Sequence, residues 1–168
     1  GQGSPIELRS VGVERSQSML EDYVEHLLKL VDVSLMRPLK VVIDAGNGMA
    51  GYTAPAVFKS LNSEVIELYF DLDGTFPNHE ANPIDPKNLQ DLSGAVKKHK
   101  ADIGLAFDGD ADRCFLVDEK GDLVNPSALT ALIADRALAS DPGSTIIYNL
   151  ISSRSVKEVI EENGGIAI

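Results

Sequence analysis

Hydrophobic and polar positions alternate along the chain with two different periods, which predict helices and strands in turn. Apolar residues recur at helical spacing from residue 19, so we expect a helix there that ends before Pro38. Short β-branched and apolar runs predict strands over 40–44, 64–70, 102–107, 114–117 and 145–150. Helical periodicity predicts further helices over 50–61, 86–99, 125–139 and 155–163. This order predicts an α/β fold in which a mixed sheet is layered with helices.

Cap and turn residues refine these boundaries. Ser18 followed by Glu21 has the spacing of a capping box, which predicts that the first helix begins beside Ser18. Residues 119–122 predict a hairpin turn. Residues 71–88 are dense in Pro, Asn, Asp and Gly, and so long a loop in a compact domain is usually functional or mobile.

The chain divides into three parts on these patterns. Residues 1–17 mix Gly, Ser, Pro and charge without a period, which is typical of a linker or a cloning-derived segment. Residues 18–124 predict one α/β domain, and residues 125–168 predict the beginning of a second α/β unit. Because the sequence stops within a predicted apolar strand, over 166–168, we expect this second unit to be incomplete.

Composition and charge disfavour several classes of protein. Hydrophobic residues make up 43% and charged residues 24% of the 168 positions, as in ordinary globular proteins, and no apolar run is long enough to span a membrane. The formal net charge of -11 argues against a nucleic-acid or anionic-membrane partner, because either would need a basic patch. The single Cys114 excludes an internal disulfide, and no secretory signal is visible, so we expect a cytoplasmic protein.

Three aspartates, Asp108, Asp110 and Asp112, stand at alternate positions of a turn that contains glycine. Carboxylates that close repel one another unless a cation neutralises them, and an all-oxygen ligand set suits Mg²⁺ or Ca²⁺. Arg113 follows directly and carries a planar guanidinium suited to a phosphate oxygen. The set fits phosphoryl transfer, although an acidic solvated turn has the same pattern. A helix-loop-helix calcium site is disfavoured, because Arg113 stands where that loop requires glycine.

A glycine pattern offers a different interpretation. Gly46, Gly48 and Gly51 follow a predicted strand with the spacing of a dinucleotide-binding loop, and Glu67 lies downstream as an acidic partner. A tight strand-to-helix connection needs glycines for its own torsions and has the same pattern. The first interpretation corresponds to a dinucleotide-binding or metal-binding module without catalysis, and the second assigns these glycines no ligand.

The run 71–75 (DLDGT) matches the signature of haloacid-dehalogenase-type phosphatases, in which Asp71 would be the nucleophile. Asp108 comes only 37 residues later, which leaves too little chain for the usual intervening elements. We therefore interpret the run as a polar loop, in which Asp and Gly serve turn formation. A phosphatase that uses Asp71 is the enzyme alternative.

Other polar candidates lie on loops and helix starts. His79 is in the predicted loop, where an ordinary loop contact is expected and a phosphate or acid–base role is the alternative. His26 and His99 lie on predicted helices, where a solvated role is expected. A predicted strand is followed by Ser152, Ser153 and Arg154, which would cap the next helix, either with that helix facing an anion or as a simple N-cap.

Three motifs taken together resemble those of the α-D-phosphohexomutase family, above all its bacterial phosphomannomutase/phosphoglucomutase branch. They are DAGNGMAG (44–51), GTFPNHEANP (74–83) and FDGDADR (107–113), and the resemblance runs from about residue 20 to the end. It implies a four-domain enzyme that interconverts hexose 6-phosphate and hexose 1-phosphate through a phosphoserine and a hexose bisphosphate. This chain would be the second domain and the start of the third.

The resemblance also implies roles for individual residues. Asp108, Asp110 and Asp112 would bind Mg²⁺, and Arg113 and Arg154 would contact phosphate or sugar. The family's phosphoserine would lie upstream, so no catalytic nucleophile is expected in this chain, which alone would be inactive. Its partners would be hexose phosphate, hexose bisphosphate and the remaining domains of the parent chain. Ile151 departs from the lysine that many relatives carry before the pair that ends in Arg154.

Overall fold

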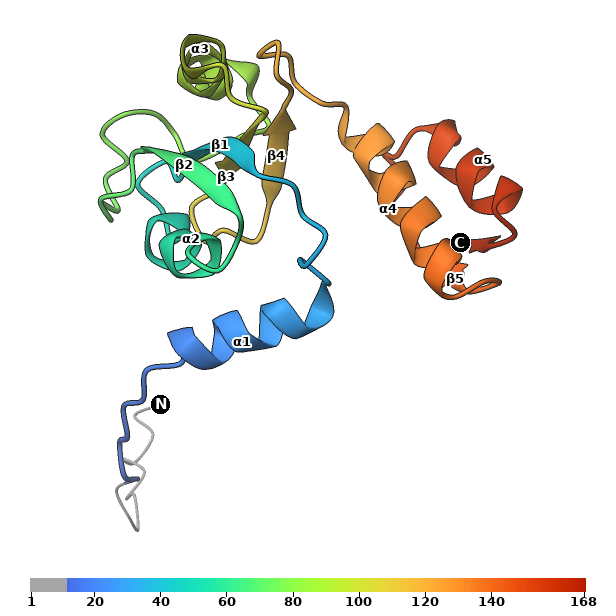
Figure 1. Cartoon of the computed structure of the whole chain (residues 1–168), viewed down its shortest axis with the longest axis horizontal. Coiled ribbons are helices and arrows are strands. Elements are labelled where there is room, and N and C mark those ends of the chain that lie inside the picture. The colour runs from blue at the N-terminus through green and yellow to red at the C-terminus, as the bar shows by residue number, and fades with distance from the viewer. Residues whose placement is uncertain (1–11) are drawn as a thin grey trace, which may run out of the picture.

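A computed structural model describes residues 12–168 and shows two lobes joined after the last strand of a sheet (Figure 1). The sheet lobe contains α1 (Leu20–Leu30), β1 (Leu39–Asp44), α2 (Ala50–Phe58), β2 (Ser63–Leu68), the 3₁₀ turn η1 (Pro86–Leu89), α3 (Gln90–His99), β3 (Ile103–Phe107) and β4 (Cys114–Val117). The helical lobe contains α4 (Pro126–Ser140), β5 (Thr145–Ile146), α5 (Arg154–Glu162) and β6 (Ile166–Ala167). The predicted α/β class is therefore confirmed.

The sheet of the first lobe has the strand order β2-β1-β3-β4. β1 pairs in parallel with β2 on one side and with β3 on the other, and β4 runs antiparallel to β3. The predicted mixed sheet is thus observed. Because β1, β2 and β3 are parallel, the loops that follow all three strands leave the sheet at the same edge.

Helices cover both faces of this sheet, as Figure 1 shows. β1, one of its two inner strands, is buried from Val41 to Asp44. On one face, Leu92 and Val96 of α3 pack with Val42 of β1 and Val117 of β4. On the other face, Ala54 of α2 packs with neighbouring residues of β1. Side chains of β1 alternate between these two clusters, which explains why its last residues are buried whether apolar or polar.

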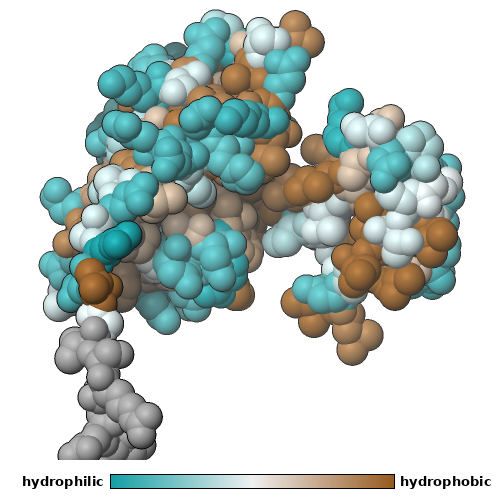
Figure 2. All heavy atoms as spheres, turned by 90° about the horizontal axis from the view of Figure 1, so that it is seen from below, coloured by the Kyte–Doolittle hydropathy of each residue, from teal (hydrophilic) through white to brown (hydrophobic). Residues whose placement is uncertain are grey.

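The helical lobe has a smaller core between α4 and α5. It consists of Ala131, Ala134, Leu138, Val156 and Ile160. The Asn125 side chain accepts a hydrogen bond from the Ser127 N–H and caps α4, and Ser153 caps α5 in the same way. Hydrophobic surface is visible on this lobe (Figure 2). Within residues 12–168, no helix is long and apolar enough to cross a membrane.

Two local predictions were wrong. α1 ends at Leu30, before Pro38 as predicted. It begins at Leu20, so Met19 takes the cap position and no side chain caps the helix, contrary to the predicted capping box. Ser18 is one residue too early for the predicted capping box. β5 has only two residues where six were predicted, because it pairs with β6, which is equally short. The predicted linker over residues 1–17 lies largely outside the described residues, and residues 12–18 have no regular secondary structure.

Candidate functional site

The predicted aspartate turn joins β3 to β4 at the edge where the parallel strands end. Asp108 is completely buried, whereas Asp110 and Asp112 are exposed, and one carboxylate oxygen of each lies within 4.8 Å of the others. The Ala111 N–H donates to the Asp108 carbonyl oxygen, and Ala111 has a left-handed φ of 62°. This backbone reversal turns the three carboxylates toward one another, as the alternate spacing predicted.

Arg113 closes the turn on Asp108. Its backbone N–H donates to Asp108 Oδ1 at 3.0 Å and its Nε donates to Asp108 Oδ2 at 2.6 Å, while Nε lies 3.5 Å from Asp112 Oδ1. Burial alone would raise the pKa of Asp108, but these two bonds and the guanidinium charge hold it below its ordinary value. Asp108 is therefore an ionised, preoriented carboxylate. The rest of the guanidinium extends outward, and 53% of the Arg113 side chain is exposed.

The loop after β1 that contains Gly46, Gly48 and Gly51, here called the glycine loop, packs against the aspartate turn. The Met49 N–H donates to the Gly109 carbonyl oxygen at 2.9 Å. A methyl group on Gly48 would lie 2.6 Å from the same oxygen, closer than non-bonded atoms approach. Gly46 and Asn47 adopt left-handed φ values of 51° and 61°, as a tight connection requires. The Gly109 backbone packs directly against Gly48, so these glycines serve a tight connection, as the turn interpretation predicted.

The DLDGT run forms turns of its own. The Asp73 carboxylate accepts hydrogen bonds from the backbone N–H and the hydroxyl of Thr75. Asn47 fixes this loop to the glycine loop. Its side-chain Nδ2 donates to the Asp71 carbonyl oxygen, and its backbone carbonyl oxygen accepts from the Asp73 N–H. Among the described residues, the group of acidic side chains that could hold a metal includes neither Asp71 nor Asp73. The polar-loop interpretation fits this geometry.

Unusual backbone torsions gather around the aspartate turn. Five described residues other than glycine have a positive φ, and four of them lie in the loops at the carboxyl edge of the sheet: Asn47, Tyr69, Phe76 and Ala111. The fifth, Lys100, ends α3. A left-handed torsion is rare for an aromatic residue. Strained residues of this kind collect where a site must be held in one geometry.

Two contacts at this edge were missed by sequence reasoning. The buried Asp44 at the end of β1 pairs with His79, whose Nε2 lies 3.0 Å from Asp44 Oδ2. The Phe76 ring lies against Gly109, because a methyl group there would be 3.4 Å from Phe76 Cζ. A polar residue at the end of an otherwise apolar, doubly covered strand was the available signal for Asp44. The exposed His26 and His99 lie on helices as predicted.

Arg154 lies in the other lobe, at the first residue of α5, and 94% of its side chain is exposed. Its guanidinium is 3.6 Å from Glu158, one helical turn away. Ser153 is the cap of α5, and a cap was predicted among Ser152, Ser153 and Arg154. A phosphate contact by Arg154 stays a prediction.

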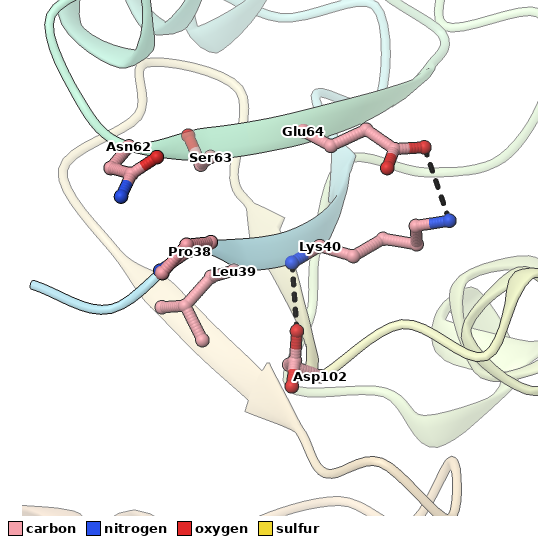
Figure 3. Close-up of a pocket in the computed structure, with 7 residues that line it drawn as sticks. All are labelled: Pro38, Leu39, Lys40, Asn62, Ser63, Glu64 and Asp102. Carbon is pink, nitrogen blue, oxygen red and sulfur yellow. Dashed lines mark hydrogen bonds and ion pairs between the residues drawn. The ribbon is translucent and has the colours of Figure 1, made fainter.

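A hollow of about 490 Å³ lies at the opposite edge of the sheet, beside the beginnings of β1 and β2 (Figure 3). Its charged groups pair with one another: Lys40 Nζ lies 3.1 Å from Glu64, and the Lys40 N–H donates to Asp102 at 2.8 Å. Arg37 binds the other oxygen of Asp102. A smaller hollow of about 190 Å³, lined in part by Gly48, Phe76 and Gly109, adjoins the aspartate turn. The candidate site is therefore at the aspartate edge.

Comparisons with known proteins agree with this geometry. Residues 21–121 match the family described as "Phosphoglucomutase/phosphomannomutase, alpha/beta/alpha domain II". The chain is 46% identical over 147 residues to a phosphoglucomutase of Neisseria meningitidis, covering 88% of this chain and 32% of that protein. It is 47% identical over 137 residues to a phosphomannomutase/phosphoglucomutase of Pseudomonas putida, covering 82% and 30%. The chain therefore spans about a third of the length of these relatives.

Solved structures give the same result. The crystal structure of a phosphoglucomutase/phosphomannomutase family protein from Burkholderia thailandensis superposes with a TM-score of 0.84 at 42% identity, covering 89% of this chain and 32% of that one. The open form of a Paramecium phosphoglucomutase, pp63/parafusin, has a TM-score of 0.65 at 24% identity, covering 88% and 28%. The second likeness shows the fold alone. The predicted family resemblance is confirmed.

Proposed function

Because the chain belongs to the phosphoglucomutase/phosphomannomutase family, we propose that it is the segment of a phosphohexomutase that supplies the Mg²⁺-binding loop. The relatives that carry these enzyme names are about three times as long, so turnover belongs to the whole protein. The parent enzyme interconverts hexose 6-phosphate and hexose 1-phosphate through a phosphoserine and a hexose bisphosphate. The other domains of that protein supply the phosphoserine and the sugar contacts.

The convergence of three carboxylates carries this proposal. Ligand oxygens on opposite sides of an octahedral Mg²⁺ lie about 4 Å apart, since each Mg–O distance is about 2.1 Å. One carboxylate oxygen of each of Asp108, Asp110 and Asp112 lies within 4.8 Å of the others, a separation close to that of ligands around one cation. An all-carboxylate set also selects a hard divalent cation over one that prefers thiolate or imidazole. Mg²⁺ bound here would neutralise negative charge on a transferring phosphoryl group.

The residues around the carboxylates have separate tasks in this proposal. Arg113 orients Asp108 through Nε and its backbone N–H and has its outer guanidinium nitrogens available for a phosphate oxygen of the substrate. The glycine loop fixes Gly109 through the Met49 N–H, so the carboxylates keep their positions when substrate binds. Arg154 makes a second phosphate contact from the helical lobe. The parent enzyme works in the cytoplasm.

A titration of this chain with Mn²⁺, as a paramagnetic stand-in for Mg²⁺, tests the metal site directly. We expect Mn²⁺ to broaden the amide NMR signals of residues 108–113 first, because paramagnetic broadening falls steeply with distance. Mg²⁺ should compete with it. Hexose phosphate added to the same sample should show no turnover, because the chain lacks the phosphoserine loop. Uniform broadening across the surface would refute the metal site. Turnover by this chain alone would refute the proposal that other domains supply the phosphoserine.

The phosphatase alternative predicts a different variant effect. We expect Asp71→Asn in the whole protein to keep mutase turnover within about twofold, since the described contact of Asp71 uses its backbone carbonyl oxygen. If Asp71 were a nucleophile, this variant would lose hydrolysis of phosphate esters altogether. Parallel assays of isomerisation and of phosphate release therefore separate the two functions.

A further inference from the structure

His79 lies between two hydrogen-bond acceptors. Its Nε2 is 3.0 Å from Asp44 Oδ2 and 3.2 Å from Asp44 Oδ1, and its Nδ1 is 2.8 Å from the Glu80 carbonyl oxygen. A carbonyl oxygen can only accept, so Nδ1 must carry a proton. An ionised carboxylate also only accepts, so Nε2 carries a proton too as long as Asp44 is ionised. Of the forms of a histidine ring, only the imidazolium donates from both nitrogens.

We propose that His79 is held as an imidazolium between Asp44 and Glu80 and acts as a positioning residue for the aspartate turn. The positioning role rests on the proposed function, whereas the charge state does not. His79 touches none of the three aspartates in any described contact and works through the two loops that support Gly109.

The electrostatic surroundings favour the charged ring. Asp44 is 1% exposed, and in the described part of the chain its ion pair is with His79. Tyr69, Asp91 and Glu80 lie around the pair, and none of these three carries a positive charge. The Tyr69 and His79 rings pack at nearly right angles with their centroids 5.3 Å apart. The Tyr69 hydroxyl donates to Asp91, and Glu80, the next residue after His79, is exposed.

Burial raises the pKa of Asp44, and the His79 charge and the Gly46 N–H act against that rise. A buried carboxylate without a counter-charge is costly, so removal of the ring proton would leave Asp44 poorly compensated. The pair therefore holds the loop around 79 onto the end of β1 most firmly while the ring is charged.

The same loop presses on the aspartate turn. A methyl group at Gly46 would meet Ala81 Cβ at 3.2 Å and His79 Cε1 at 3.5 Å, so the glycine loop and the 76–82 segment are in contact. A methyl group at Gly109 would meet Phe76 Cζ at 3.4 Å and Ala81 Cβ at 3.9 Å. His79 thus anchors a segment whose other residues contact the backbone between Asp108 and Asp110. Phe76 keeps its left-handed φ of 50° only if that segment is held from elsewhere.

Nitrogen NMR of the ¹⁵N-labelled chain, recorded without metal, tests both parts. At neutral pH we expect both ring nitrogens of His79 to give signals of protonated nitrogens, and His79→Gln assigns them by their loss. In the folded His79→Gln variant, the amide signals of Gly109 and Arg113 should shift. His99→Gln is the matched control, because His99 is exposed on α3, and it should leave both amide signals in place.

A signal of an unprotonated ring nitrogen at neutral pH would overturn the imidazolium. Unmoved signals of Gly109 and Arg113 in His79→Gln would overturn the positioning role. If that variant does not fold, the wild-type chain decides: when the pH is raised until His79 loses its proton, the Gly109 amide signal should shift in step with the ring signals, and a stationary signal refutes the coupling. These NMR spectra are recorded without metal, so they do not depend on the metal site. Failure of Mn²⁺ binding would refute the proposed function, whereas the ring nitrogen signals would still decide the charge state of His79.

Discussion

The Asp110→Asn variant of the whole protein is expected to lose mutase turnover by a factor of about 10² to 10³, the usual effect of removing one preorganised electrostatic contact. Asp110 is the best choice among the three carboxylates. Asp108 is buried and holds the turn through Arg113, and Asp112 lies 3.5 Å from Arg113 Nε, whereas Asp110 is exposed. Asparagine keeps the shape and one oxygen, so the change removes mainly charge. Steady-state rates over a range of Mg²⁺ concentrations measure it, and the Mg²⁺ needed for half-maximal rate should rise.

Folding should survive this substitution. The three carboxylates repel one another without a cation, so removing one charge should leave the melting temperature of the metal-free protein unchanged or slightly higher. Asp122→Asn is a matched control, since Asp122 is an exposed aspartate in the next turn and makes its described contacts through backbone atoms. It should keep normal turnover. Near-normal turnover of Asp110→Asn at limiting Mg²⁺ would exclude Asp110 as a ligand.

The second large effect is expected from Gly48→Ala. The new methyl group would lie 2.6 Å from the oxygen and 2.9 Å from the Cα of Gly109, which are backbone atoms that cannot rotate away. Overpacking of this kind typically costs about 1 to 3 kcal/mol in the free energy of unfolding. Gly48 does not have a positive φ, so the contact with Gly109 and not a forbidden torsion causes the loss. Urea unfolding followed by circular dichroism measures the change.

Gly48→Ala should also weaken binding of Mn²⁺, because Gly109 stands between two of the proposed ligands and must move. The matched control is Gly94→Ala, in the interior of α3, where a methyl group would meet nothing within 4 Å. Alanine at that position should stabilise the chain by about 0.5 to 1 kcal/mol and leave Mn²⁺ binding unchanged. If Gly48→Ala unfolds at the same urea concentration as the wild type and binds Mn²⁺ with the same affinity, the glycine loop does not support the aspartate turn.

These expectations give the glycine motif a definite role. Its spacing is that of a nucleotide-binding loop, yet Gly48 is required for the approach of a neighbouring turn and not for that of a phosphate. Gly51 is constrained in the same way, since a methyl group there would overlap the Phe70 carbonyl oxygen. Two loops distant in sequence therefore limit each other's side chains. A short motif alone cannot distinguish a ligand from a packed backbone as the cause of its glycines.

Much of the fold was predictable because it depends on local properties. β1, β3 and β4 lie within one residue of their predicted bounds, since apolar β-branched runs between turn residues identify buried strands. η1 and α3 together cover the predicted helix over 86–99. The predictions failed where the length or burial of an element depends on another element that it pairs with or packs against. β5 is short because β6 is short, and the amphipathic pattern of α1 did not reveal that none of its residues would be buried.

The sequence by itself determined the alternation of strands and helices, the turn between the third and fourth strands and the three carboxylates that stand at alternate positions of this turn. These features arise from torsions and side chains within a few residues of one another. Only the tertiary structure decided that β1 lies between β2 and β3, that Met49 binds Gly109, and that His79 reaches Asp44. Asp44 and His79 are 35 residues apart, and their contact exists only once the parallel strands bring the loops that follow them to one edge.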